Sequence, residues 1–431
     1  MKRIALLASF ALASACGGGN SPAPAAGSTG AFGIVNVGGK QKLYLPATDA
    51  TTNHAVIQVI DAGQNGNGTT GAGGLIKSID LGASEGATAT GGDATVVIAA
   101  STNVRTIWFI DPTTDAITKT IMLPMTYGTS NFSGGGGYVT GIAIDSANHR
   151  AILSVYNGFA LVDLQSQSIT QNIQAPPVEN FGYDSVNQRI IAPFYACDSA
   201  VDGNSAPLTF CGDYKTTAGA KITDGLNVID LKKNIVYTYE DDTAADPTRP
   251  LGGEPDSAAI DPNNSIAVVP SEGDGVQYVL DLSKAAFDDA KKTFTVPAAN
   301  RHAIMGQSMT GVAIESSNHL GFWEAEHTDD VGFISLSDAS QGKGTFLHGH
   351  VPNTPDGSSW ANLGDPHGIA VTTGLSNGVP VGFVVSADRK WVARIDLNKL
   401  AQLKPAVAGG DLSTTDMAPV VTFFDASKAT P

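Results

Sequence analysis

The sequence is poor in charge and in cysteine, and it lacks several short motifs that mark common enzyme classes. Charged residues make up only 15% of the 431 residues, and there are three cysteines. After the N-terminal segment, no stretch approaches the ~20 apolar residues that a membrane-spanning helix needs. There is no HExxH motif, no CxxC motif and no Walker-type phosphate loop. The sequence therefore argues against a polytopic membrane protein, and it carries no signature of a zinc protease or a P-loop enzyme.

The charge balance and the glycine content indicate the class of domain. Acidic residues outnumber basic ones by 41 to 25, for a formal net charge of −16. Such an excess argues against nucleic acid or anionic lipid headgroups as the main partners. The 49 glycines, together with the scarcity of long helical periodicity, are typical of a turn-rich β protein.

The first 15 residues are predicted to be a signal peptide. A basic start is followed by an apolar run over residues 4–13, which is too short for a permanent transmembrane helix. Small residues then lead into Cys16, and this stretch resembles the lipobox of bacterial lipoproteins, although Ala13 stands where that family usually has Leu. The resemblance implies that Cys16 is acylated after cleavage. An ordinary secretory signal is the alternative.

Residues 16–31 are predicted to be a lipidated, flexible tether. They are rich in Gly, Pro, Ala and Ser and carry almost no apolar bulk to bury. The acyl chains on Cys16 would then be the membrane anchor. This organisation implies a protein of the cell envelope, anchored in the outer membrane on its periplasmic or surface side.

Cys197 and Cys211 are the two cysteines that remain if Cys16 carries lipid. In an oxidising compartment we expect them to form a disulfide, which would stabilise the fold by about 3 kcal/mol on the chain-entropy model. Two free thiols are the alternative.

One strand pattern recurs seven times along the chain. Each copy has two or three apolar residues followed by an acid or its substitute, and we interpret it as the third strand of a four-stranded unit. The copies end at Asp61, Asp111, Asp163, Asp230, Asp281, Ser335 and Asp396.

A second pattern precedes most of these copies and predicts the first strand and its turn. It reads GIAIDSAN at 141–148, FGYDSVN at 181–187, AAIDPNN at 258–264 and GVAIESSN at 311–318. The acid favours a tight turn, and we expect the Asn three residues later to adopt the left-handed conformation that closes it.

Seven units of four short antiparallel strands predict an all-β, seven-bladed β-propeller over residues 32–431. Such units cannot bury both faces alone, and radial stacking solves this. We place the blades at 32–84, 85–126, 137–177, 178–243, 254–298, 308–352 and 365–427, with the fourth strand of blade five at 293–296. The patterns resemble the YVTN-type, NHL-type and lactonase-like propellers. That resemblance implies the fold and says little about function, because such scaffolds carry out many activities.

The long loops are predicted to share one face of the propeller. They are the segments 197–224, 240–255, 298–308 and 350–366, and long loops on a rigid support usually carry function. The opposite face is expected to offer mainly tight turns, such as 145–149 and 315–319, with little concave surface for a ligand.

The channel mouth on the loop-rich face is one candidate site. His367, facing Asp256 and Glu179 across the channel, could act as a general base or hold a cation. A hydrated polar lining without chemistry is the alternative. The ring of first-strand residues at this mouth is predicted to be Thr88, Thr140, Glu179, Asp256, Thr310 and His367.

A second candidate site lies on blade six. Acidic residues and His327 are expected in one loop over residues 324–330, and His348 and His350 alternate on a strand, so they point to the same side. We predict that His327, Glu326, His348 and His350 are candidate ligands for a divalent cation. A calcium site made by the acidic loops and a solvated surface are the alternatives.

Two functions stay open from the sequence. The first is a binding or scaffold lipoprotein that captures a small molecule, a glycan or a protein partner on its loop-rich face. The second is an enzyme of the lactonase or lyase kind that uses His367 with Asp256 or Glu179. Trp323, Trp360 and Trp391 could line a sugar or aromatic pocket, but buried packing is favoured for at least two of them.

Overall fold

A computed structural model gives the fold of most of the chain after residue 31. It describes residues 32–49, 51–52, 54–62, 74–82, 89–101, 105–124, 139, 141–155, 158–176, 178, 180–195, 214–216, 218–255, 257–305, 309–325, 329–343, 347–360, 364–372, 379–386, 390–406 and 411–426.

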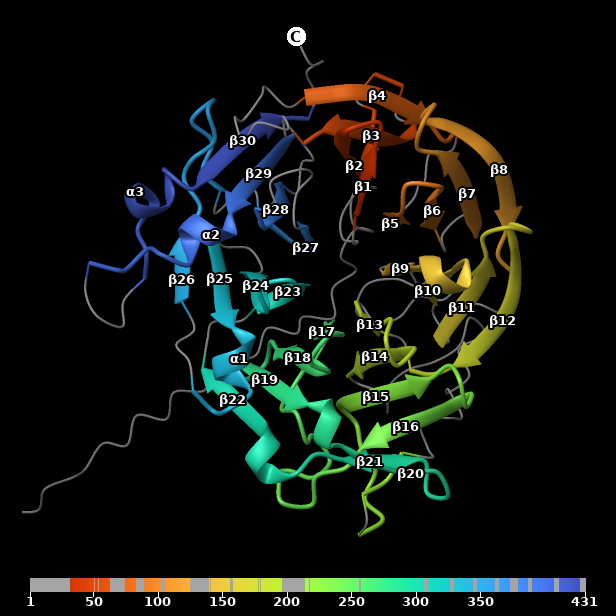
Figure 1. Ribbon diagram of the computed structural model, residues 1–431, viewed down its shortest axis with the longest axis vertical. Coiled ribbons are helices and arrows are strands. Elements are labelled where there is room, and N and C mark those ends of the chain that lie inside the picture. The colour runs from red at the N-terminus through yellow and green to blue at the C-terminus, as the bar shows by residue number, and fades with distance from the viewer. Residues whose placement is uncertain are drawn as a thin grey trace, which may run out of the picture.

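Seven small antiparallel sheets form a ring, which confirms the seven-bladed β-propeller (Figure 1). Blade one contains β1 (Gly33–Val37), β2 (Lys40–Thr48), β3 (Ala55–Asp61) and β4 (Gly74–Asp80). Blade two contains β5 (Ala89–Gly92), β6 (Val97–Ser101), β7 (Thr106–Asp111) and β8 (Ala116–Met122). Blade three contains β9 (Ile142–Asp145), β10 (Arg150–Val155), β11 (Gly158–Asp163) and β12 (Ser168–Gln174).

The remaining blades follow in chain order. Blade four contains β13 (Gly182–Asp184), β14 (Arg189–Phe194), β15 (Gly225–Asp230) and β16 (Ile235–Tyr239). Blade five contains β17 (Ala259–Asp261), β18 (Ile266–Ser271), β19 (Val276–Asp281) and β22 (Arg301–Met305). Blade six contains β23 (Met309–Glu315), β24 (Leu320–Ala325), β25 (Asp330–Ser335) and β26 (Leu347–His350). Blade seven contains β27 (Gly364–Thr372), β28 (Val381–Ser386), β29 (Trp391–Asp396) and β30 (Val421–Asp425).

The strand pattern that ends in an acid is the third strand of every blade, as predicted. β3, β7, β11, β15, β19, β25 and β29 end at the seven expected residues. The first strands β1, β5, β9, β13, β17, β23 and β27 lie nearest the centre of the ring (Figure 1). Small residues are needed there, because a Cβ on Gly182 would lie 3.1 Å from the backbone of Ala259 in the next blade.

The turn after the first strand closes differently from our expectation. Asn148 does not adopt the left-handed conformation; the next residue, His149, does, with φ of 52°. Asn148 instead uses its side-chain amide and its backbone N–H to donate to the carboxylate of Asp145, at 2.8 and 3.3 Å. The acid at this position is buried, so the Asn is needed to satisfy it. The residues after Asn187, Asn264 and Asn318 likewise have positive φ.

Blade four carries an additional hairpin that was not predicted. β20 (Ala286–Asp288) and β21 (Thr293–Thr295) belong to the chain between β19 and β22, but β21 pairs in parallel with β16. The prediction that residues 293–296 form the fourth strand of blade five is therefore wrong, and β22 takes that place. The segments 293–296 and 301–305 are both short, and only the non-local pairing shows which of them belongs to blade five.

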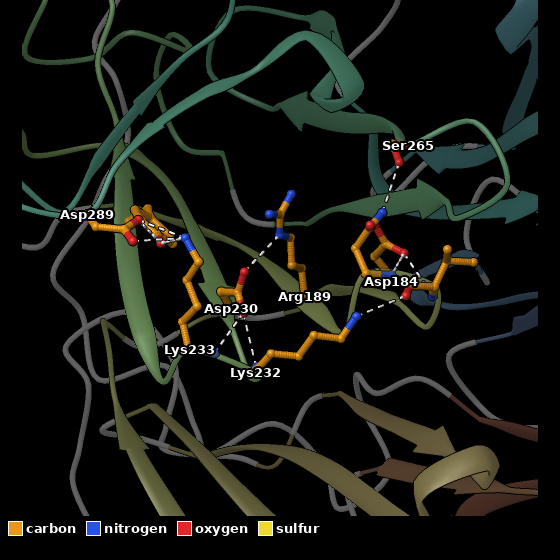
Figure 2. A network of polar contacts seen from close by, with 10 residues as sticks. Asp184, Arg189, Asp230, Lys232, Lys233, Ser265 and Asp289 are labelled. Atoms are coloured by element: carbon orange, nitrogen blue, oxygen red, sulfur yellow. Dashed lines mark hydrogen bonds and ion pairs between the residues drawn. The ribbon is translucent and has the colours of Figure 1, made fainter.

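A polar network fastens this hairpin to blade four (Figure 2). The Lys233 ammonium lies 2.9 Å from both carboxylate oxygens of Asp289, and the Tyr237 hydroxyl donates to the same group at 2.6 Å. These hydrogen bonds, that of Tyr237 first, lower the pKa of Asp289. The Arg189 guanidinium lies 4.3 Å above the ring of Phe287 and bonds to Asp230 at 3.3 Å. The hairpin thus links blades four and five on the outside of the ring.

The ring closes by packing of the first blade against the last, without an exchanged strand. Blade one uses residues 33–80 and blade seven uses residues 364–425, so neither borrows a strand from the other. One buried cluster joins Leu43, Leu45 and Ile60 of blade one with Phe383 and Phe424 of blade seven. Burial of apolar side chains therefore holds the first and last blades together.

Other sequence predictions have mixed outcomes. Trp323, Trp360 and Trp391 are all buried, which confirms their packing role. Cys16, Cys197 and Cys211 lie outside the described residues, so lipidation and the disulfide stay predictions. The helices are single turns: α1 (Leu336–Ala339), α2 (Leu397–Leu400) and α3 (Thr414–Met417). No helix in the described part of the chain is long and apolar enough to cross a membrane.

Candidate functional site

The side chains of the channel-mouth candidates lie outside the part of the chain that the structure describes. Glu179 and Asp256 lie outside the described residues, and His367 lies within β27 but its side chain is not described. Glu326 and His327 also lie outside the described residues. All four, together with His367, stay predictions.

The best-defined candidate site is a group of histidine and aspartate side chains at the outer edge of blade six. We call Asp329, Asp330, His348, His350 and Asp411 the histidine–aspartate cluster. Among the described residues, Asp329, Asp330 and His350 form the group whose ligand atoms all lie within 4.8 Å of one another. Of the four predicted ligands, His348 and His350 lie among the described residues, and His350 belongs to this three-residue group. Metal binding in this region stays a prediction.

Strand pairing positions the first three members of the cluster. Asp330 begins β25 and lies directly opposite His350, the last residue of β26. Nδ1 of His350 is 3.0 Å from Oδ1 of Asp330 and 3.1 Å from Oδ1 of Asp329. The backbone N–H of Val351 donates to the carbonyl of Asp329 at 2.7 Å, which ties the two segments together. Strand pairing thus fixes Asp330 and His350, and a backbone hydrogen bond holds Asp329 beside them.

Asp411 reaches the cluster from blade seven. It lies between β29 and β30, and the following residue Leu412 forms a parallel bridge with Gly349. One carboxylate oxygen of Asp411 is 3.1 Å from Nε2 of His348, and the other is 3.8 Å from Nε2 of His350. Both imidazoles therefore face one carboxylate, as expected for residues that alternate on a strand. The sequence around Asp411 did not predict its contact with the two histidines, because the contact depends on the fold of the long insertion between β29 and β30.

Gly349, between the two histidines, is required by this docking. A Cβ at this position would lie 2.8 Å from the side chain of Leu412 and 2.8 Å from the sulfur of Met417 in α3. The backbone of residues 411–417 can approach β26 only because the side chain is missing. The HGH sequence therefore serves both the packing and the cluster.

The charges around His350 favour a cation at this place. Partial burial opposes protonation of the ring, but the carboxylates of Asp329, Asp330 and Asp411 outweigh it and raise the pKa of His350. Asp330 is nearly buried, with 7% of its side chain exposed, whereas His350 is 34% exposed. The cluster can hold a proton or another cation, and solvent reaches it from one side.

The position of Glu324 corrects one expectation for this region. We expected it in the same loop as Asp329 and Asp330, but it lies within β24 and is fully buried. β24 and β25 extend further than the charge pattern suggested, so Asp330 is a strand residue as well. Glu324 belongs to the interior of blade six and not to its exposed rim.

A polar hollow of about 400 Å³ lies on the loop-rich face between blades four and five. It is lined by the connection after β16 together with Asp274, Tyr278 and Arg301. Its walls are fixed by ion pairs: Arg249 binds Asp224 at 3.0 Å, and Arg301 binds Asp241. Such a pre-formed polar hollow suits a small hydrophilic ligand.

The opposite face also has a hollow, which corrects the expectation that it offers little concave surface. This hollow has a volume of about 480 Å³ and is lined by Asp93, Asp111, His149 and Gln165, among others. Its lining comes from the turns of blades two and three. Because both faces have a hollow, concavity does not distinguish them. The feature that distinguishes the loop-rich face is the histidine–aspartate cluster.

Comparisons with known proteins support the fold alone. No family model matches the chain, and no curated protein matches it. The complex of KlAtg21 with the coiled-coil of AgAtg16 is similar at 9% identity with a TM-score of 0.53, covering 93% of this chain and 100% of that one. A functionally unknown protein from Desulfotomaculum acetoxidans DSM 771 is similar at 9% identity and 0.51, covering 89% and 99%. Kuenenia stuttgartiensis hydrazine synthase has 11% identity and 0.49, covering 77% and 84%.

Proposed function

We propose that this chain is an envelope-tethered β-propeller lipoprotein that binds a small molecule, a glycan or a protein partner on its loop-rich face. The β-propeller fold is consistent with a binding or scaffold role. The observation that carries the choice of face is the histidine–aspartate cluster, which gathers side chains from blades six and seven at the edge bearing the turn between β24 and β25.

Pre-organisation supports a binding role at this face. The members of the cluster are held by the β25–β26 pairing and by the bridge between Gly349 and Leu412. The polar hollow between blades four and five, on the same face, has walls that are fixed by ion pairs. A surface that is already ordered loses little conformational entropy on binding, so its polar groups can contribute to affinity.

The tether supports the place of action. Residues 1–15 read as a signal peptide, Cys16 as the lipidated residue, and residues 16–31 as a flexible spacer. We propose that the acyl chains anchor the propeller at the outer membrane, from which it captures ligands or partners in the periplasm or outside the cell. A similarity to YVTN-type, NHL-type or lactonase-like propellers is part of this proposal and rests on the strand patterns.

The alternative is a lactonase- or lyase-like enzyme with its site at the channel mouth. It requires His367 to work with Asp256 or Glu179. No contact among the described residues favours it, so it serves here as an outcome of the test.

The test is a ligand screen with variants on each face. The full chain, purified in detergent, is screened by thermal shift against sugars, small organic acids, lactones and divalent metal ions. Each hit is then measured on His348→Ala/His350→Ala, which alters the cluster, and on His149→Ala/Gln165→Ala, which alters the hollow on the opposite face. A third variant, His367→Ala, addresses the channel mouth.

The proposal predicts that binding is lost in the cluster variant and kept in the opposite-face variant. Loss only in His149→Ala/Gln165→Ala would place the working surface on the other face and overturn the proposal. Turnover of a lactone that is lost only in His367→Ala would favour the enzymatic alternative instead.

A further inference from the structure

We propose that Asp329, Asp330 and His350 bind a divalent transition-metal ion of the Zn²⁺ class, and that Asp411 orients His350 from the other side of its ring. This inference goes beyond the proposed function, and the site would stand even if the propeller captured no other ligand. It rests on the geometry of the histidine–aspartate cluster.

The distances between the side chains suit one ion. Nδ1 of His350 lies 3.0 Å from Oδ1 of Asp330 and 3.1 Å from Oδ1 of Asp329, and the three ligand atoms are all within 4.8 Å of one another. Ligands bound to zinc at about 2.0–2.2 Å in a tetrahedral site lie roughly 3.3–3.6 Å apart. Small rotations of the three side chains would therefore bring them to coordinating positions around an ion.

The second nitrogen of His350 lies close to a carboxylate, the kind of group that orients a metal-bound histidine. Such a histidine coordinates through one ring nitrogen and donates the other N–H to a carboxylate, which fixes the ring and makes it a better ligand. Here Nδ1 faces the two aspartates, and Nε2 lies 3.8 Å from Oδ2 of Asp411, so this contact has to shorten to become a hydrogen bond when an ion binds. The other oxygen of Asp411 is 3.1 Å from Nε2 of His348. His348 therefore holds the orienting carboxylate, and we do not place it among the ligands of the ion.

Backbone contacts hold each of the three ligand residues in place, and their side chains are partly exposed to solvent. Asp330 and His350 are register partners on adjacent strands, and Asp329 is held through its carbonyl by the backbone of Val351. The exposed fraction of the side chain is 27% for Asp329, 7% for Asp330 and 34% for His350. Three protein ligands with solvent at the remaining position is the pattern of a metal site that can also bind water or a further ligand.

The donor set selects the kind of ion. One imidazole with two carboxylates suits Zn²⁺, Co²⁺, Ni²⁺ or Mn²⁺. Ca²⁺ prefers six to eight oxygen ligands, so an imidazole nitrogen makes it a poor fit here. The absence of thiolate or thioether donors from the group argues against Cu⁺. A purely ionic cluster, in which a protonated His350 alone neutralises the carboxylates, is the competing account.

The experiment uses the full chain, purified in detergent without a polyhistidine tag and stripped of metal. Zn²⁺ is titrated by calorimetry, and Co²⁺ is titrated by visible absorption, because the intensity of its d–d bands reports a low-symmetry protein site. We expect one saturable site. The variants His350→Gln and Asp329→Asn/Asp330→Asn should abolish it, and Asp411→Asn should weaken it by about 10- to 100-fold.

A matched control separates this site from ordinary histidine–carboxylate pairs. His54 lies 3.0 Å from Asp80 on blade one, in a pair that is exposed and forms no three-residue group among the described residues. His54→Gln should leave the affinity and the stoichiometry unchanged. Circular dichroism and the thermal midpoint without metal show that each variant is folded.

Several results would overturn the proposal. One is the absence of saturable Zn²⁺ or Co²⁺ binding by the unaltered chain. Another is binding that survives in folded His350→Gln, or that is lost in Glu326→Ala/His327→Ala while His350→Gln keeps it. A third is binding of Ca²⁺ in place of Zn²⁺, which would assign the acidic side chains to a different kind of site.

Discussion

The sharpest test of the packing between blades is the substitution Asp115→Asn. Asp115 lies in the turn between β7 and β8 of blade two, and its carboxylate accepts hydrogen bonds from two residues of blade one. The Lys42 ammonium donates at 2.7 Å and the Tyr44 hydroxyl at 2.6 Å. Only 9% of the Lys42 side chain and 7% of the Asp115 side chain are exposed, so water solvates neither charged group well.

The magnitude follows from what the substitution leaves behind. Asparagine keeps the shape and tolerates the positive φ of 51° at this position, but it removes the negative charge. The Lys42 ammonium then stays buried with the carbonyl of Pro112, at 2.8 Å, as its remaining strong partner. Removing one member of a buried ion pair costs about 3–5 kcal/mol, because the other charge is left uncompensated. We expect this loss in the free energy of unfolding.

Urea denaturation followed by tryptophan fluorescence measures this loss in the free energy of unfolding. Trp108 in the same blade is nearly buried, so its fluorescence reports on the unfolding of the blade. The double variant Lys42→Met/Asp115→Asn should recover most of the stability, because it removes the uncompensated charge as well. Lys291→Met provides the exposed control: its ion pair with Asp288 is 4.0 Å long and should contribute nothing measurable. The reasoning would be refuted if Asp115→Asn shifted the denaturation midpoint no more than Lys291→Met does.

Three further predictions concern ring closure, alkaline pH and the cysteines. Phe383→Ala should lower the free energy of unfolding by about 3–5 kcal/mol in urea denaturation, since it opens a cavity between blades one and seven; a loss below about 1 kcal/mol would contradict this. Burial raises the pKa of Tyr239 to about 12, so the folded state keeps this proton above the unfolded pKa of about 10. The associated stability is present below pH ~10 and lost as the pH rises through about 12, and Tyr239→Phe should flatten that loss in pH-dependent melting; an unchanged slope would count against it. If Cys16 is acylated and Cys197 is bonded to Cys211, as the sequence predicts, a free-thiol assay on denatured, unreduced protein should find no thiol, whereas two thiols would exclude the disulfide.

The strand pattern predicted the architecture because it is local. An apolar strand ending in an acid, such as the one ending at Asp163, marks the point where a blade turns from its third strand to its fourth. The apolar run and the acid that caps the following turn are contiguous in the sequence, so the pattern can be recognised without knowledge of tertiary contacts. It therefore located the last residue of every third strand. The hairpin of β20 and β21 escaped prediction because its partner, β16, is about 55 residues away and the pairing is parallel.

Only the local part of the candidate site could be read from the sequence. His348 and His350 share a strand, so their common direction could be read from the sequence. The approach of Asp411 could not, since it depends on an insertion that folds back onto β26 and on the room that Gly349 leaves for Leu412. Buried contacts between blades, such as Lys42 with Asp115, leave no mark in the sequence either, because residues of either type are usually exposed.

Histidine footprinting in intact cells tests the central claim that the edge of blades six and seven is the working surface. Diethyl pyrocarbonate modifies accessible imidazoles, and mass spectrometry compares intact cells with purified, metal-free protein. His350 is 34% exposed in the isolated chain, and His149 is exposed on the opposite face. We expect His350 to be protected in cells by its ligand, its metal ion or its partner, while His149 is modified equally in both samples. Equal modification of His350, or protection of His149 alone, would contradict it.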